Sequence, residues 1–330
     1  MKKTIFLIAA ALVAASCVPG HKTPSDSGRD RSETVHKGAS KPAVKPFPTV
    51  NVPAIYADPQ ERIGFMLDHY WDNWFKEGGV TDSVTILGVR KVDVEQAFAN
   101  YTAVLDGAPL KDAQKSLSAL FRKLEAEQKN NPDKHTYLQF TEILSRYLYD
   151  PNSPLRNEDY YLPVVAAMAE SPWTREEMRP AYNYEAKTCA MNRYGSIAPD
   201  FKFRTLEGKV LSLHGVKADY TMLFFSNPYC EACKGIINDV MSRRYMNDFI
   251  AQGRVAVVNV YIDEEVDKWR EYAPNYPSNW HSGYDYLFRV RNDELYCVRA
   301  IPSLYLLDKD KKVIMKDAPT EKVLNFLDTL

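Results

Sequence analysis

The sequence predicts an all-helical domain followed by an α/β domain whose mixed sheet is flanked by helices, and two patterns support this prediction. From residue 58 to residue 193, apolar residues recur at offsets of three and four, the spacing of one face of an α-helix. From residue 194 onward, short apolar runs typical of buried strands alternate with helical stretches. Without the first 50 residues, about 280 residues remain, which fits two domains of ordinary size.

The first 17 residues are typical of a lipoprotein signal peptide. Two lysines precede an apolar run from Ile5 to Ala15, and Ser16 stands directly before Cys17. The run is too short to span a bilayer as a helix of the mature protein. We therefore expect lipidation of Cys17 and anchoring to a membrane of the bacterial cell envelope, facing the periplasm. In the alternative, an ordinary secretory peptide with an accidental cysteine, the chain is still exported.

Residues 18–50 are predicted to form a disordered tether. They contain prolines, serines and lysines but almost no large apolar side chains, so no core can form there. The whole chain balances 42 Lys and Arg against 43 Asp and Glu, and 45% of its residues are apolar. This balance indicates a soluble globular body without a nucleic-acid partner, held at the membrane only through its lipid anchor.

Residues 51–193 are predicted to form the helical domain. Asp58 supplies an N-cap for the first helix, Pro59 lies in its first turn, and Glu61 occupies the capping-box position. Apolar stripes then follow at helical spacing: Ile63, Met66, Leu67, Tyr70, Trp71, Trp74 and Phe75; Val94, Phe98, Tyr101 and Leu105; Leu110, Leu117, Leu120, Phe121 and Leu124; Tyr137, Phe140, Ile143, Leu144 and Tyr147. We expect their aromatic rings in the core rather than around a ligand groove.

Two more helices are expected at 158–169 and 174–191, the second with a capping box formed by Thr174 and Glu177. Residues 194–330 then predict the α/β domain. Its expected strands are a hairpin at 201–204 and 209–213, and single strands at 221–225, 255–262, 303–307 and 312–315. Its expected helices are at 233–250, 264–272 and 320–330, which gives a mixed sheet with helices on both faces.

Cys230 and Cys233 follow an apolar strand that breaks at Asn227-Pro228, and they open the next predicted helix. Their spacing puts both sulfurs on one side of the first turn, a layout typical of a redox-active dithiol. Cys230 faces the unpaired N–H groups of the helix start, which stabilise a thiolate.

Three motifs resemble the thioredoxin superfamily, most closely its TlpA/ResA type: the Cys-Glu-Ala-Cys-Lys run at 230–234, the segment 195–201, and Ala300-Ile301-Pro302. The resemblance covers residues 194–330. It implies a thioredoxin-like fold in which Pro302 is cis, lies against the cysteine pair and pairs through its backbone with an extended substrate. The segment 147–158 resembles a helical domain found in exported bacterial lipoproteins, whose function is not established.

In such a site Cys230 is expected to exchange with the substrate, and Cys233 to resolve the mixed disulfide. Glu231 places a carboxylate beside the thiolate and destabilises it, which favours the disulfide and makes the pair more reducing. Tyr229 replaces the tryptophan usual in the family, and Phe224 stands where thioredoxin has a buried acid.

The cysteine pair also allows two other interpretations, an inert stabilising disulfide or half of a zinc site. No second Cys-x-x-Cys or histidine pair occurs at zinc spacing, so we expect neither a metal nor a cofactor. A peroxiredoxin is disfavoured because Asn227 stands where that class has threonine or serine. Cys189 and Cys297 are expected to be buried free thiols, although the sequence allows other pairings.

Two functions from different classes follow. The first is an exported, membrane-tethered thiol-disulfide oxidoreductase that reduces protein or peptide disulfides and is recycled by an unidentified thiol redox partner. The second is a non-catalytic binding lipoprotein whose helical domain recognises a ligand or partner and whose cysteine pair is structural.

Overall fold

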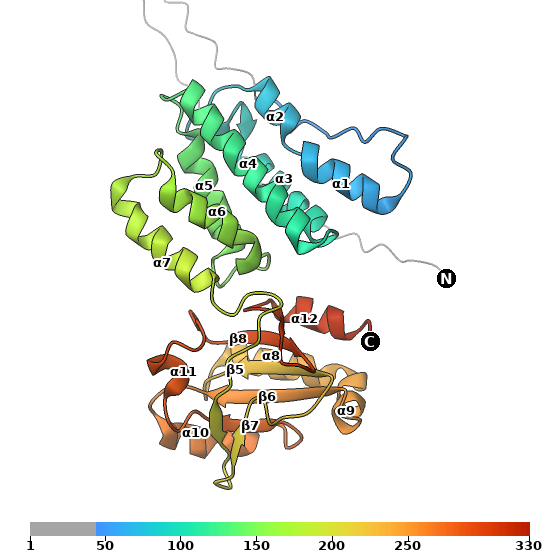
Figure 1. Cartoon of the computed structure of the whole chain (residues 1–330), viewed down its shortest axis with the longest axis vertical. Coiled ribbons are helices and arrows are strands. Elements are labelled where there is room, and N and C mark those ends of the chain that lie inside the picture. Colours follow the sequence, from blue (N-terminus) through green and yellow to red (C-terminus); the bar gives the residue numbers. More distant parts are fainter. Residues whose placement is uncertain (1–43) are drawn as a thin grey trace, which may run out of the picture. The chain divides into compact units, whose positions relative to one another are not determined.

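The computed structural model describes residues 44–330, so the expected signal peptide, Cys17 and most of the expected tether lie outside it. The described residues form helices α1–α7 with a short hairpin, followed by a seven-stranded mixed sheet with its own helices (Figure 1). The predicted fold class is confirmed.

The end of the expected tether belongs to the helical domain instead. The backbone N–H of Lys45 donates to Gly88 O at 3.0 Å, and Phe47 and Val50 pack against the helical core. The ring of Phe47 lies edge-on to Trp71, with ring centroids 5.4 Å apart. The tether prediction was therefore wrong for residues 45–50, because a single aromatic side chain anchors a segment whose average composition is polar.

We expect Phe47→Ala to lower the free energy of unfolding by about 2 kcal/mol, the value of burying a large apolar side chain. Ile55→Ala is the matched control, because Ile55 is 82% exposed and its truncation is expected to stay within about 0.5 kcal/mol. Urea unfolding followed by circular dichroism measures both variants. Equal values for the two variants would mean that residues 44–50 do not contribute to the folded domain.

The first helix begins as predicted. Helix α1 spans Pro59–His69, and the Asp58 carboxylate accepts from the N–H groups of Gln60 and Glu61 at 2.8 and 3.1 Å. The apolar stripe beyond it does not continue in one helix, because the chain bends after His69 and resumes as α2. The remaining helices are α2 (Asp72–Glu77), α3 (Lys91–Asp106), α4 (Leu110–Asn130), α5 (Thr136–Leu148), α6 (Glu158–Glu170) and α7 (Arg179–Cys189).

A two-stranded hairpin was not predicted in this domain. Strands β1 (Thr85–Ile86) and β2 (Val89–Arg90) pair antiparallel across a turn in which Leu87 and Gly88 both have positive φ. Positive φ at both central residues is the geometry of the tight hairpin turn that glycine favours.

The second predicted capping box is wrong. The Thr174 hydroxyl is not a helix cap but hydrogen-bonds to the Tyr137 hydroxyl at 2.7 Å. A short 3₁₀ helix, η1, spans Glu176–Met178, and α7 starts only at Arg179. The Arg179 guanidinium donates to the carbonyls of Ala169 and Ser171 and thereby ties this turn to the end of α6.

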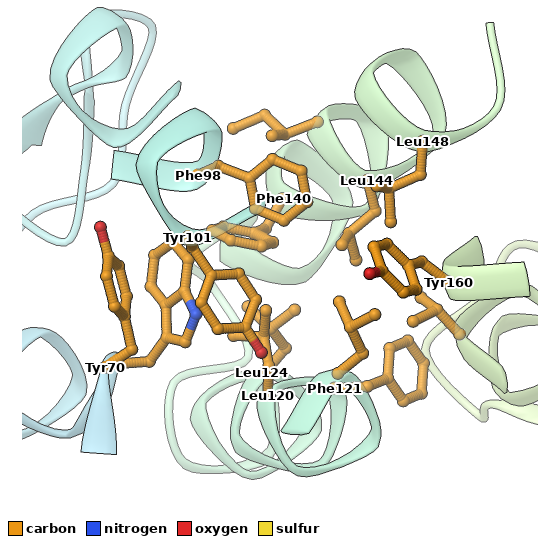
Figure 2. Packing of buried hydrophobic residues seen from close by; sticks show 14 of the residues in the cluster. Tyr70, Phe98, Tyr101, Leu120, Phe121, Leu124, Phe140, Leu144, Leu148 and Tyr160 are labelled. Carbon is orange, nitrogen blue, oxygen red and sulfur yellow. The ribbon is translucent and has the colours of Figure 1, made fainter. Parts of the chain in front are cut away.

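The aromatic residues of the helical stripes form the core, as expected. Trp74 is 0% exposed, and Trp71 lies edge-on to Phe140 at 5.2 Å between ring centroids. Figure 2 shows Phe98 beside Phe140 among leucines from α4 and α5. Burial therefore accounts for these rings without a ligand.

The sheet has the strand order β4-β3-β7-β6-β5-β8-β9, in which β5 runs parallel to β6 and antiparallel to β8 (Figure 1). Its strands are β3 (Lys202–Arg204), β4 (Val210–Ser212), β5 (Tyr220–Phe225), β6 (Val255–Tyr261), β7 (His281–Tyr284), β8 (Ser303–Asp308) and β9 (Val313–Met315). The predicted strands are present, whereas β7 was missed. Its sequence, His-Ser-Gly-Tyr, lacks an apolar run.

Helices cover both faces of this sheet. One face packs against α8 (Glu231–Ser242), α9 (Arg244–Ala251) and α12 (Thr320–Leu327). The other packs against α11 (Arg289–Asn292) and the segments beside it, while α10 (Val266–Tyr272) contributes to a smaller aromatic cluster. The single helix predicted at 233–250 is in fact α8 and α9, separated where Arg243 adopts an extended conformation with ψ 109°.

Candidate redox site

Cys230 is the N-cap of α8. Strand β5 ends at Phe225, and the chain turns through Tyr229, whose φ is 58°, before α8 begins at Glu231. The backbone N–H of Cys233 donates to the Cys230 sulfur at 3.1 Å. A sulfur in this position receives the partial positive charge of the helix start, so its thiolate is stabilised when the pair is reduced.

Cys230 and Cys233 form a disulfide, with their Cα atoms 5.2 Å apart. The two sulfurs are not equally accessible. Cys233 is 2% exposed within the apolar cluster beneath α8, whereas Cys230 is half-buried at its rim. An incoming thiol or disulfide therefore reaches Cys230 first.

Pro302 lies at the same end of the sheet. The Ile301–Pro302 peptide bond is cis, and β8 begins at the next residue, Ser303, which pairs with Phe225 at the end of β5. Ile301 packs on the same apolar cluster as Cys230 and Cys233. The structure thus brings together the three residues that the sequence predicted as catalytic.

The two predicted modulating residues flank the cysteine. Glu231 is the first residue of α8 and is exposed. Tyr229 is 60% exposed and lies edge-on to Tyr272 at 5.1 Å between ring centroids. Local desolvation and the nearby Glu271 carboxylate raise the pKa of Tyr229, so its hydroxyl stays protonated at neutral pH.

A neutral polar cluster, Ser226 with Asn259 and Tyr276, lies beneath the site and was not predicted. The Ser226 hydroxyl donates to Asn259 Oδ1 at 2.5 Å and lies 3.4 Å from the Tyr276 hydroxyl. Phe224 is fully buried two residues before Ser226. The sequence contained part of this signal, because Asn259 interrupts an apolar run and Ser226 ends another. Their pairing is long-range, however, and the sequence does not indicate it.

The other two cysteines of the described chain are free thiols. Cys189, the last residue of α7, is fully buried, as predicted. Cys297, which was also expected to be buried, is only half-buried and lies in an irregular segment. Burial raises the pKa of both thiols, which disfavours their thiolate forms at neutral pH.

Two negative findings concern residues 44–330 alone. No group of three or more His, Cys, Asp or Glu side chains there is arranged to hold a metal ion. No helix in the same range has both the length and the apolar character that crossing a membrane requires.

Known proteins match both halves of the chain. Residues 22–189 match a family described as a domain of unknown function, DUF5106. A thioredoxin-like protein from Bacteroides caccae is 33% identical, with a TM-score of 0.72, over 87% of this chain and 99% of its own. No curated protein matches the sequence.

Two further similarities are confined to the C-terminal part. The C-terminal domain of an uncharacterized protein from Bacteroides fragilis is 39% identical over 42% of this chain and 98% of its own, with a TM-score of 0.40. The thioredoxin domain of a thiol-disulfide oxidoreductase from Bacteroides vulgatus is 23% identical over 42% of this chain and 96% of its own, with a TM-score of 0.37.

The likeness to the Bacteroides caccae protein spans both domains, and the geometry of Cys230, Cys233 and Pro302 agrees with it. The narrower resemblance to the TlpA/ResA type stays a prediction. The chain belongs to the thioredoxin-like proteins and carries at its N-terminal side a domain of the DUF5106 family.

Proposed function

We propose that the protein is a thiol-disulfide oxidoreductase that reduces protein or peptide disulfides through Cys230 and Cys233. One observation carries the proposal: the accessible sulfur caps a helix, its disulfide partner is buried, and a proline directly precedes the neighbouring strand. A purely structural disulfide does not require this asymmetry between the two sulfurs.

The exchange has two steps. The Cys230 thiolate attacks a substrate disulfide, a mixed disulfide forms, and one substrate sulfur leaves as a thiolate. The Cys233 thiolate then attacks the Cys230 sulfur, which releases the second substrate thiol and forms the disulfide seen here. Two electrons pass from the dithiol to the substrate, so an external dithiol donor must reduce the pair before the next turnover.

We further propose that the protein is exported and tethered to a membrane, which the predicted signal sequence supports. Lipidation of Cys17 anchors the chain to a membrane of the cell envelope, and the residues that follow let the two domains act in the periplasm. A periplasmic reductant of this kind works on disulfides formed in an oxidising compartment.

The reduction potential of the Cys230–Cys233 pair tests the proposal. Thiol trapping of residues 18–330 across redox buffers is expected to show a reversible couple nearer the potential of thioredoxin, about −270 mV, than that of a strong oxidant, about −120 mV. Glu231 favours this direction because it destabilises the adjacent thiolate. A disulfide that resists reduction below about −300 mV would instead indicate a structural bond.

A further inference from the structure

A buried cluster of charged side chains connects the helical domain to the residues around Pro302. We call it the bridging charge cluster; its members are Arg156, Glu158, Arg299, Lys316 and Asp317. Glu158 is the first residue of α6 and 2% exposed, and Arg299 precedes Pro302 by three residues. The cluster therefore spans more than a hundred residues of sequence.

The helical domain contributes Arg156 and Glu158 to this cluster. Glu158 contacts both Arg299 and Lys316. Its Oε1 accepts from Arg299 Nε at 2.9 Å, and its Oε2 lies 2.6 Å from Lys316 Nζ. The carboxylate also stands in the first turn of α6, where the helix dipole favours a negative charge. Arg299 reaches further across the boundary, because its guanidinium donates to the backbone carbonyl of Tyr149.

Asp317 connects Arg299 to the start of β8. Its Oδ2 accepts from Arg299 Nη2 at 3.0 Å, and its Oδ1 accepts from the Ser303 hydroxyl at 2.8 Å. Ser303 directly follows Pro302 and pairs with the last residue of β5. An unbroken chain of charge-assisted contacts thus runs from α6 through Arg299 and Asp317 to the residue next to the cis proline.

The cluster contains two carboxylates and three cations, and the ion pairs give every charge an opposite partner. Such a set is costly to bury, and a hydrophobic contact of the same size would join two domains equally well. What the ionic set adds is a fixed geometry, because the planar guanidinium of Arg299 contacts Glu158 and Asp317 in defined directions.

We propose that Glu158, Arg299 and Asp317 are positioning residues that hold Pro302 in place against the Cys230–Cys233 pair, so that the start of α6 is a working part of the redox site. The inference rests on the proposed function. The thioredoxin resemblance implies that an extended peptide disulfide pairs with the backbone beside Pro302 while its sulfur meets Cys230, whereas a small disulfide needs only the sulfur of Cys230.

Glu158→Gln tests this proposal because it preserves the shape of the side chain and removes its charge. Two substrates with the same leaving group are compared, dithionitrobenzoate and a short extended peptide in mixed disulfide with thionitrobenzoate. We expect the variant to react with the peptide at least about tenfold more slowly than the wild type, since small misplacements cost that much. Its rate with the small disulfide is expected to stay within about twofold of the wild-type rate. Its reduction potential is expected to stay within about 10 mV of the wild-type value.

Lys322→Met is the matched control. Lys322 pairs with Asp106 at 2.7 Å across the same domain boundary, but this pair is exposed and has no connection to Ser303. The control is expected to behave as the wild type with both substrates. Ser303→Ala, which removes only the hydroxyl that donates to Asp317, makes the same test if the Glu158 variant fails to fold.

Amide hydrogen exchange across residues 299–305 measures how firmly the backbone around Pro302 is held. Faster exchange there in Glu158→Gln, but not in Lys322→Met, together with a slower reaction of the peptide disulfide alone, supports the positioning role. Unchanged exchange, or an equal slowing with both disulfides, overturns it. A wild-type protein that reacts with neither disulfide contradicts the proposed function instead.

Discussion

Cys230→Ser is expected to lower the rate of disulfide reduction by about a thousandfold or more, because loss of a nucleophile removes the covalent step itself. The reason is structural: Cys230 is the accessible sulfur of the pair, and Cys233 is sealed in the apolar cluster beneath α8. Cys233→Ser is expected to allow the first exchange but not its resolution, so a mixed disulfide between Cys230 and its substrate accumulates.

Insulin reduction followed by turbidity measures the loss, and non-reducing electrophoresis detects the trapped species. Cys297→Ser is the control, since this half-buried free thiol lies outside the proposed exchange and its removal is expected to leave the rate unchanged. If Cys230→Ser kept its activity, or if Cys233→Ser trapped nothing, the non-catalytic binding lipoprotein would become the better hypothesis.

Trp74→Ala is expected to destabilise the protein by about 3–5 kcal/mol, the usual cost of removing a large aromatic side chain from a packed core. Trp74 is 0% exposed and lies against Phe75 and Phe140, with ring centroids 4.9 and 5.5 Å away. The gap that alanine leaves is bordered by residues from several helices, so it cannot collapse completely.

Urea unfolding followed by circular dichroism measures the change in the free energy of unfolding. Trp173→Ala is the matched control, because it deletes the same side chain from a position only partly buried against the same core. We expect its cost to be clearly smaller, on the order of 1–2 kcal/mol. A Trp74→Ala protein as stable as the control would be incompatible with the core described above.

Features fixed by neighbouring residues were predictable from sequence. The Asp58 cap, the hairpin at β3 and β4, and the cysteine pair at the start of α8 each depend on a few adjacent side chains. The break between α8 and α9 was not predictable in the same way. Arg243 interrupts an apolar stripe that continues with helical period on both sides, and its side chain bonds instead to Asp328 near the C-terminus.

The surroundings of the candidate site were harder to predict than the site itself. The Ser226–Asn259 contact joins the residue after β5 to β6, and the Arg299–Glu158 contact joins the two domains through residues 141 positions apart in the chain. A single sequence contains no periodicity that pairs such residues. Phe47 shows the same limit, since one anchoring ring does not change the polar composition of the segment around it.

Lys316 connects the end of α7 to a part of the chain that is synthesised much later. Its ammonium group donates to the carbonyls of Thr188 and Cys189 in the last turn of α7 and to the carbonyl of Met191 just beyond it. A growing chain that has emerged only to residue 191 lacks this cation. The last turn of α7 is therefore bonded to a residue translated more than a hundred codons later, and this contact forms only once the redox domain has been made.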